Sequence, residues 1–156
     1  MDGEGRSRSQ HRIARSEQGL LFYCDLMNDD QPYLIRTDSG PIVSVPYTVE
    51  MNDISMMALQ HHPSEEWLRR GIDQFDRLYS EGEKSARIMA ISVHPYITGA
   101  PHRIGYLEKL YAYIRSREGV WMCKGEDILD WYLANQVEGR SRGRVESVFK
   151  SVELLS

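Results

Sequence analysis

The sequence predicts an α/β fold in which helices cover a largely parallel β-sheet. Short apolar segments alternate along the chain with segments whose apolar residues recur at helical spacing. The apolar segments are continuous rather than alternating with polar residues, which is typical of strands that are covered on both faces. The segments between the later strands are long enough for crossover helices, so we expect those strands to pair in parallel.

Five segments have the composition of strands. They are residues 20–24, 33–36, 42–46, 87–93 and 120–123. The second and third flank Asp38-Ser39-Gly40-Pro41, a turn sequence, so we expect a hairpin there. Polar loops are expected after the first strand, at residues 28–32, and after the hairpin, at residues 47–53.

Three helices are predicted, at about residues 64–79, 101–117 and 126–133. In the first, Trp67, Leu68, Ile72 and Phe75 lie at helical spacing and form one apolar stripe. Residues 1–18 hold too few apolar side chains to order themselves, so we expect a frayed lead-in. The single domain is expected over residues 19–136. The polar tail, residues 137–156, carries a weak amphipathic pattern that favours a short final helix.

Composition narrows the function classes. The chain has 156 residues, and 19 basic against 23 acidic residues give a net charge of −4, which is the wrong sign for a nucleic-acid-binding surface. No apolar run approaches the roughly 20 residues of a membrane span, and the first residues lack the apolar core of a secretory signal. The two cysteines, Cys24 and Cys123, lie in apolar segments and are expected to be buried thiols. We therefore expect a cytoplasmic protein with no nucleic-acid or membrane partner.

Polar residues cluster directly after the predicted strands. The clusters contain Asp29 and Asp30, then Glu50, Asn52 and Asp53, and finally His94. Because sites in α/β folds assemble at the carboxyl ends of the strands, we expect these side chains to share one rim. Carboxylates and an imidazole at such a rim are suited to general acid–base hydrolysis.

A purely structural interpretation of each cluster stays open. The Asp29-Asp30 pair and the Asn52-Asp53 pair could equally cap backbone N–H groups of their own turns. His94 could be a histidine with no role beyond ending its strand, and His102 could be exposed or capping. The sequence has no HxxxH, HxH or CxxC spacing, so it shows no complete metal site. It also lacks a glycine-rich phosphate loop and a GxSxG elbow.

Several segments, in this order, resemble one protein family. They are Asp29-Asp30-Gln31-Pro32-Tyr33, residues 45–53 (VPYTVEMND), His94-Pro95-Tyr96 with residues 99–103 (GAPHR), Gly119-Val120-Trp121 and Asp130-Trp131-Tyr132. Together they resemble the C-terminal half of polysaccharide deacetylase-like proteins, in the branch that contains cofactor-independent allantoinases. The resemblance covers roughly residues 20–135.

This resemblance implies part of a distorted (β/α) barrel and hydrolysis of carbon–nitrogen bonds other than peptide bonds. It implies that His94 is the general acid and that Asp29 or Asp30 orients it. The implied substrate-binding residues are Pro46, Tyr47, Glu50, Asn52, Asp53 and His102. The implied partner is a small molecule with an amide-like or N-acetylated group, such as a ureide, a cyclic amide or an N-acetyl sugar.

The sequence departs from the family in its extent. The early aspartate pair and the histidine pair that hold metal in the metal-dependent branch have no counterpart here. A full barrel needs about 200–250 residues, so we expect a fragment with about half of the barrel. No cofactor is expected, and a divalent metal such as zinc is expected only together with the missing half. The alternative hypothesis is an inactive α/β remnant that binds a partner or associates with itself as a homo-oligomer.

Overall fold

The computed structural model describes residues 15–16, 19–20, 22–38, 40–138 and 150–155. Its elements in chain order are β1 (Arg15–Ser16), β2 (Gly19–Leu20), β3 (Phe22–Tyr23), β4 (Tyr33–Thr37), β5 (Gly40–Ser44), the π-helix η1 (Ile54–Leu59), α1 (Ser64–Glu81), β6 (Ile88–Ser92), α2 (Ile104–Arg115), β7 (Val120–Cys123), α3 (Gly125–Glu138) and β8 (Lys150–Leu155). The mixed α/β class that the sequence predicts is confirmed.

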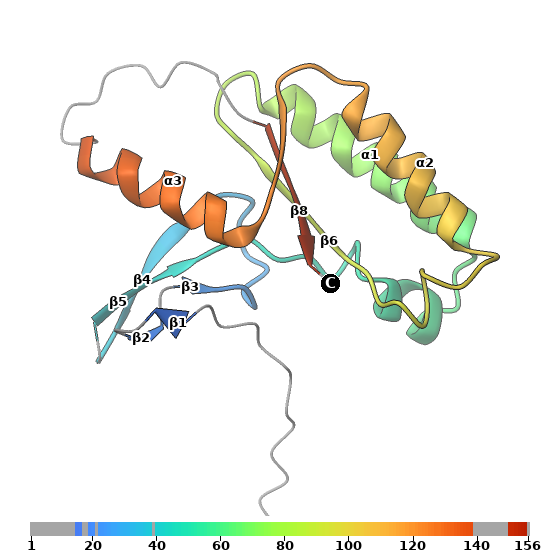
Figure 1. Cartoon of the computed structure of the whole chain (residues 1–156), viewed down its shortest axis with the longest axis horizontal. Helices are drawn as coiled ribbons and strands as arrows, with labels where there is room; N and C mark the ends of the chain where they lie inside the picture. Colours follow the sequence, from blue (N-terminus) through green and yellow to red (C-terminus); the bar gives the residue numbers. More distant parts are fainter. Residues whose placement is uncertain (1–14, 17–18, 21, 39, 139–149, 156) are drawn as a thin grey trace, which may run out of the picture.

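Two three-stranded sheets form the framework, and they differ in strand direction (Figure 1). In the first, β5 is central and pairs antiparallel with β4 and parallel with β3. In the second, the order is β6-β8-β7 and both pairs are parallel. The predicted hairpin and the predicted parallel strands are therefore both present, in separate sheets. The short strands β1 and β2 pair with each other.

The core follows the helical stripes that the sequence predicts. Helices α1 and α2 lie side by side on one flank of the molecule (Figure 1). Trp67 and Phe75 from α1, Leu110 from α2 and Ile91 from β6 belong to one buried cluster. The helices approach closely at Gly71, where a Cβ atom would lie 2.8 Å from a methyl group of Leu110. This packing fixes the strand β6 against the helix layer.

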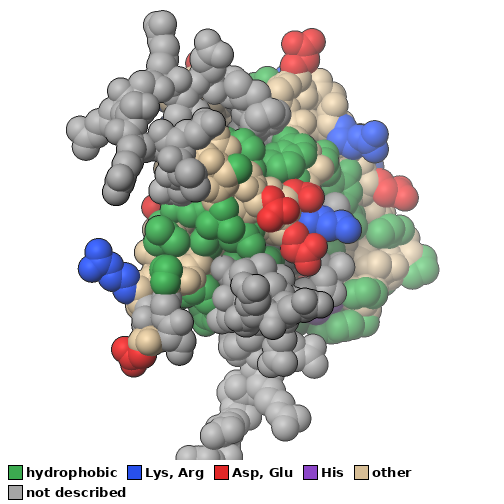
Figure 2. Space-filling model, turned by 60° about the vertical axis from the view of Figure 1, so that its left-hand side comes forward, with side chains coloured by type: hydrophobic (Ala, Val, Ile, Leu, Met, Phe, Trp, Pro, Cys, Tyr) green, Lys and Arg blue, Asp and Glu red, His purple; other side chains and the backbone are tan. Residues whose placement is uncertain are grey.

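A second buried cluster lies between α3 and the first sheet. It joins Phe22 and Val43 to Ile128 and Leu129. Cys24 and Cys123 are also in this cluster, and both are buried thiols, as predicted. On the face drawn in Figure 2, charged side chains of both signs lie among apolar ones and do not form one basic area. None of the helices in the described ranges is both long and apolar enough to cross a bilayer.

Some elements differ from the predictions. Residues 150–155 form the strand β8, where the tail was expected to hold a short helix. The π-helix η1 was not foreseen, and α2 begins at Ile104 because residues 101–103 form turns. Helix α3 is longer than predicted and reaches Glu138. Most of the expected lead-in, residues 1–14, lies outside the described residues, but Arg15–Ser16 belong to β1.

Candidate active site

A carboxylate and an imidazole from distant parts of the chain meet beyond the end of β6. Asp53 follows the loop after β5 and directly precedes η1, whereas His94 lies two residues past the end of β6. A single parallel bridge between Asn52 and Ser92 holds the loop against the strand end. The main-chain N–H of Ser92 also donates to the carbonyl of Met51. These contacts place the residues that follow, Asp53 and His94, next to each other.

The carboxylate of Asp53 is fully buried and accepts four hydrogen bonds. Its Oδ1 lies 2.6 Å from Nδ1 of the His94 ring. Its Oδ2 accepts the His94 main-chain N–H at 2.7 Å and the Thr98 hydroxyl at 2.6 Å. A longer bond, of 3.3 Å, comes from the Thr98 main-chain N–H. A buried carboxylate with this many donors is held in one orientation.

The contact with Asp53 determines how the imidazole can act. An ionised carboxylate only accepts hydrogen bonds, so Nδ1 of His94 must carry the proton of the shared bond. The other nitrogen, Nε2, has no hydrogen-bond partner among the described residues, and 31% of the side chain is exposed. The ring of Tyr96 lies beside it, with ring centroids 5.5 Å apart. His94 therefore offers Nε2 to a ligand while its other side is anchored.

A second small network lies next to this pair. The amide of Asn52 donates to the Tyr47 hydroxyl at 2.9 Å, and that hydroxyl donates to Ser92 Oγ at 3.3 Å. The side-chain oxygen of Asn52, Oδ1, accepts the main-chain N–H of Ile54 at 2.9 Å. Asn52 thus also caps the start of η1, as the structural interpretation of the sequence allowed. Tyr47 and Asn52 therefore lie beside Ser92, at the end of β6 that leads to His94.

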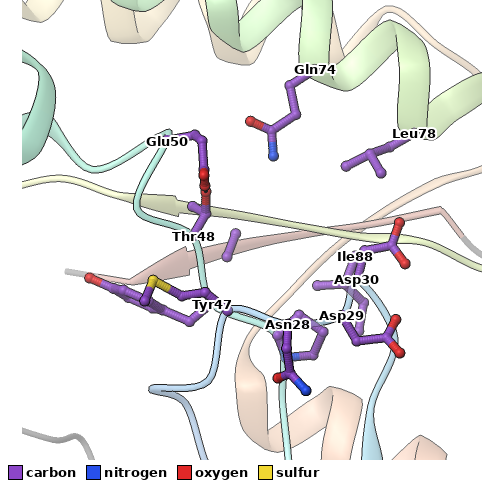
Figure 3. A pocket seen from close by; sticks show the side chains of 12 residues that line it. Asn28, Asp29, Asp30, Tyr47, Thr48, Glu50, Gln74, Leu78 and Ile88 are labelled. Atoms are coloured by element: carbon purple, nitrogen blue, oxygen red, sulfur yellow. The ribbon is translucent and has the colours of Figure 1, made fainter.

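Tyr47 also lines a cavity of about 290 Å³ (Figure 3). Of the predicted site residues, it is lined by Asp29, Asp30, Pro46, Tyr47 and Glu50. In Figure 3, Glu50 comes from the loop after β5, and Gln74 reaches toward it from α1. Glu50 accepts a hydrogen bond of 3.1 Å from the Thr48 hydroxyl. The predicted residues are therefore divided between two neighbouring places that Tyr47 connects.

Asp29 and Asp30 do not orient His94, which corrects the role expected for them. The carbonyl of Asp30 accepts the N–H of Ile88, the first residue of β6, whereas His94 lies beyond the last residue of that strand. The Asp30 carboxylate lies 3.3 Å from Arg87, and burial raises its pKa against the opposing effect of that guanidinium. Asp29 accepts the N–H of Gln31 at 3.1 Å, which is the local turn contact that the structural interpretation predicted.

His102 is not brought to the site either. It lies in the turns before α2 and is exposed, and it has no hydrogen bond to another described residue. Sequence reasoning also missed two residues, Thr98 and Ser92. Ser92 is a buried polar residue at the end of an apolar strand, and this was a signal in the sequence. Thr98 gave no such signal, because only the fold of the turn brings it to Asp53.

The described residues do not provide a metal-ligand set. Within the described ranges, no group of three or more His, Cys, Asp and Glu side chains is arranged to hold a metal ion. Asp53 and His94 are engaged with each other through Nδ1, and the acidic residues of the cavity surround no imidazole.

The comparisons with known proteins agree with this architecture. No protein-family model matches the chain. A protein of Schizosaccharomyces pombe named as a polysaccharide deacetylase is 36% identical over 124 residues, which cover 72% of this chain and 39% of that protein. A crystal structure of a protein named as a polysaccharide deacetylase, from Pseudomonas aeruginosa PAO1, matches with a TM-score of 0.70 and 31% identity, over 76% of this chain and 40% of that one.

A crystal structure of Puue allantoinase matches with a TM-score of 0.71 and 31% identity, over 74% of this chain and 39% of that one. The chain thus spans about two-fifths of the length of the proteins that it matches. Sequence and structure point to the same group of proteins. Over about three-quarters of its length, the chain is similar to proteins named as polysaccharide deacetylases and to an allantoinase.

Proposed function

We propose that the chain carries the acid–base centre of a hydrolase that acts on carbon–nitrogen bonds other than peptide bonds. The observation that carries this proposal is the contact of 2.6 Å between the buried Asp53 carboxylate and Nδ1 of a partly exposed His94 ring, whose Nε2 has no hydrogen-bond partner among the described residues. A buried carboxylate that fixes an imidazole in this way is a recurrent arrangement for moving protons in catalysis. The similarity to polysaccharide deacetylases and an allantoinase supports the reaction class.

In the proposed reaction, water adds to the carbon of an amide-like group and loses a proton to a base. The bond from this carbon to nitrogen then breaks, and the departing nitrogen takes a proton from Nε2 of the His94 imidazolium. Asp53 stabilises that imidazolium through Nδ1 and keeps the ring in one orientation. His94 is then neutral and regains its proton from solvent. Positioned proton transfer of this kind contributes about 10²- to 10⁴-fold to a rate.

The residues around the pair suggest the substrate class. Tyr47 and Asn52 border the pair, and the cavity that Tyr47 also lines is rich in oxygen acceptors from Thr48 and Glu50. Such a lining favours a small polar molecule that carries several N–H or O–H groups. We therefore propose a ureide, a cyclic amide or an N-acetylated sugar as substrate. Allantoin and an acetylated polysaccharide are the two natural test compounds, because the names of the similar proteins refer to them.

We also infer that the two sheets are a portion of a distorted (β/α) barrel. The TM-scores of 0.70 and 0.71 support a shared architecture over about three-quarters of this chain. The alternative from the sequence, an inactive α/β remnant that binds a partner or associates with itself, makes a different prediction. It requires that the Asp53–His94 pair turns over no substrate.

The experiment is a hydrolysis assay on the purified chain with allantoin and with an N-acetylated oligosaccharide. We expect release of product, and we expect a loss of about 10²-fold or more in kcat for His94→Ala and for Asp53→Asn. His61→Asn removes an exposed imidazole from a loop outside the site, and asparagine tolerates the positive φ of 56° found there. This control should retain the activity. Turnover that persists in folded His94→Ala would contradict the proposal, and no turnover in any form would favour the inactive module.

A further inference from the structure

The turn that carries His94 also reaches back to the carboxylate that holds it. The turn runs from His94 to Gly99, and it is closed by main-chain bonds from Ile97 and Thr98 to the carbonyl of His94, at 2.9 and 3.0 Å. Thr98 is 1% exposed, and its hydroxyl is 2.6 Å from Oδ2 of Asp53. One carboxylate therefore contacts the beginning and the end of the same turn.

The two oxygens of Asp53 have different partners. Oδ1 accepts only the bond from the His94 ring, whereas Oδ2 accepts the His94 main-chain N–H at 2.7 Å and the Thr98 hydroxyl at 2.6 Å. The Thr98 main-chain N–H is a weak third donor to Oδ2, at 3.3 Å, because the carbonyl of His94 shares it. Loss of the hydroxyl would leave Oδ2 with one short bond, and the carboxylate could then rotate away from the ring.

We propose that Thr98 is a positioning residue whose hydroxyl locks the Asp53 carboxylate and thereby fixes the tautomer of His94. This inference rests on the acid–base role proposed above for His94, because the tautomer matters only if Nε2 meets a substrate. A short bond from a hydroxyl to a buried carboxylate is among the stronger hydrogen bonds in proteins. It is also local, so its removal leaves the rest of the sheet and the helix layer untouched.

A merely structural role would have a different signature. The turn itself is closed by main-chain bonds, which a change of the Thr98 side chain does not remove. If the hydroxyl served only to hold the turn, its loss would lower stability and leave the His94 ring as it was. If it positions Asp53, the balance of protons between the two ring nitrogens must change.

The direct test is nitrogen-15 NMR of the His94 ring in the full chain, which distinguishes the Nδ1–H from the Nε2–H tautomer. In the unsubstituted chain we expect the Nδ1–H form to exceed the other by about tenfold or more. In Thr98→Val, which keeps the shape and removes the hydroxyl, we expect this ratio to fall by about three- to tenfold. Thr98→Ser keeps the hydroxyl and should stay within about twofold of the unsubstituted chain.

Ser116→Ala is the matched control, because it removes a hydroxyl that donates at 2.6 Å to the carbonyl of Tyr113, far along α2 from the site. It should leave the His94 ratio unchanged. An unchanged ratio in folded Thr98→Val would overturn the proposal. If Thr98→Val does not fold, the unsubstituted chain still decides the question. Its Thr98 hydroxyl proton should exchange slowly with solvent because the Asp53 carboxylate holds it, and a rapidly exchanging hydroxyl proton would equally overturn the proposal.

These measurements separate the two proposals. The tautomer ratio is read without any substrate, so a chain that hydrolyses neither test compound still reports on Thr98. Conversely, turnover that is lost in His94→Ala while the ratio ignores Thr98→Val would support the function and remove only the positioning role.

Discussion

Two acidic loops, which follow the parallel strands β3 and β5 of the first sheet, have different partners. After β5, Asp53 meets His94, which follows β6 of the second sheet, beside a parallel bridge that joins Asn52 to Ser92. After β3, in the mixed sheet, Asp29 and Asp30 lie in a loop that returns to the beginning of β6 and leads into the antiparallel strand β4. The same sequence signal, acidic residues after an apolar strand, thus leads to a fully hydrogen-bonded site in one case and to a turn with an ion pair in the other.

The difference shows what gathers residues at a rim. Parallel strands end at one edge, but the acidic residues that follow the parallel strands β3 and β5 still have different partners, so strand direction alone does not bring them together. A hairpin reverses the chain, and the loop before it is free to run along a strand instead of staying at its end. Acidic residues after a strand therefore join the site here where their loop is bridged to the end of a strand in the other sheet, as Asn52 is to Ser92.

The largest effect we predict contrasts the two carboxylates directly. Asp53→Ala should lower the free energy of unfolding by about 3 kcal/mol, because it leaves the buried Thr98 hydroxyl and the His94 N–H without their acceptor. Asp30→Ala should lower the free energy of unfolding by less than about 1 kcal/mol, because the contact of Asp30 with Arg87 is partly exposed. Urea unfolding of both variants measures the difference. Equal losses would show that the two regions do not differ in the way described.

A smaller effect is expected within the turn that carries the site. A Cβ atom at Gly99 would lie 2.3 Å from the carbonyl oxygen of Pro95, so Gly99→Ala must distort the turn, at a cost of about 2 kcal/mol. Gly105, six residues on in α2, has no atom within 4 Å of such a Cβ. Gly105→Ala should stabilise the chain by about 0.5–1 kcal/mol through helix propensity. Thermal unfolding of the pair tests this, and a harmless Gly99→Ala would show that the turn is not tightly closed.

A third prediction concerns the helix layer beside the parallel sheet. Burial raises the pKa of Tyr111 to about 12, and its buried hydroxyl has no partner among the described residues. Tyr111→Phe should therefore raise the free energy of unfolding by about 1 kcal/mol at neutral pH. Between pH 10 and 12 the unfolded chain loses the Tyr111 hydroxyl proton before the folded chain does. The free energy of unfolding of the unsubstituted protein therefore falls as the pH rises through this range, and the variant does not show this fall.

Chemical unfolding at pH 7, 10 and 11.5 measures the Tyr111 effect as a difference between the two proteins, which cancels the titration of the other tyrosines. A difference that is constant across these pH values would mean that the phenol is not desolvated.

The smallest effect is expected on the exposed face of α1. Hydrogen bonds from Arg69 and Arg70 lower the pKa of Glu66 to about 2. The folded-state pKa of Glu66 lies below its unfolded value. The contacts of Glu66 with the two arginines therefore contribute stability above about pH 4.5, and this contribution is lost as the pH falls toward 2. Glu66→Gln should flatten the dependence of the melting temperature on pH in this window. Glu83→Gln, an exposed residue just past the same helix, serves as the control, and an equal change there would contradict the assignment to Glu66.

Much of the framework was predictable because it depends on local pattern. The spacing of Trp67 and Phe75 predicts α1, and the turn sequence around Asp38 predicts the hairpin of β4 and β5. Asp53 and His94 were both identified as candidates, but Asp53 was expected to line the substrate pocket and not to hold the imidazole. The sequence predicts that Asp53 and His94 each follow a strand, but it does not predict that they contact each other.

The remaining features depend on contacts between distant residues. Asp30 pairs with Arg87 and with the start of β6 because the loop turns back, which no local pattern announces. The tail residues around 150–155 have a weak helical pattern, but two flanking strands provide hydrogen bonds on both sides and β8 forms. Propensity is a weak guide where tertiary pairing provides the partners.

The place of β8 has a consequence for how the chain is made. It lies between β6 and β7, so residue 88 pairs with residue 151, and residue 120 pairs with residue 150. Until residues 150–155 have been synthesised, β6 and β7 lack the strand that pairs with both of them. The backbone groups along these strand edges then stay unpaired. Contacts this far apart in sequence form slowly. Assembly of the parallel sheet is therefore a late event in biosynthesis, and chaperones have their best opportunity to engage the nascent protein in that interval.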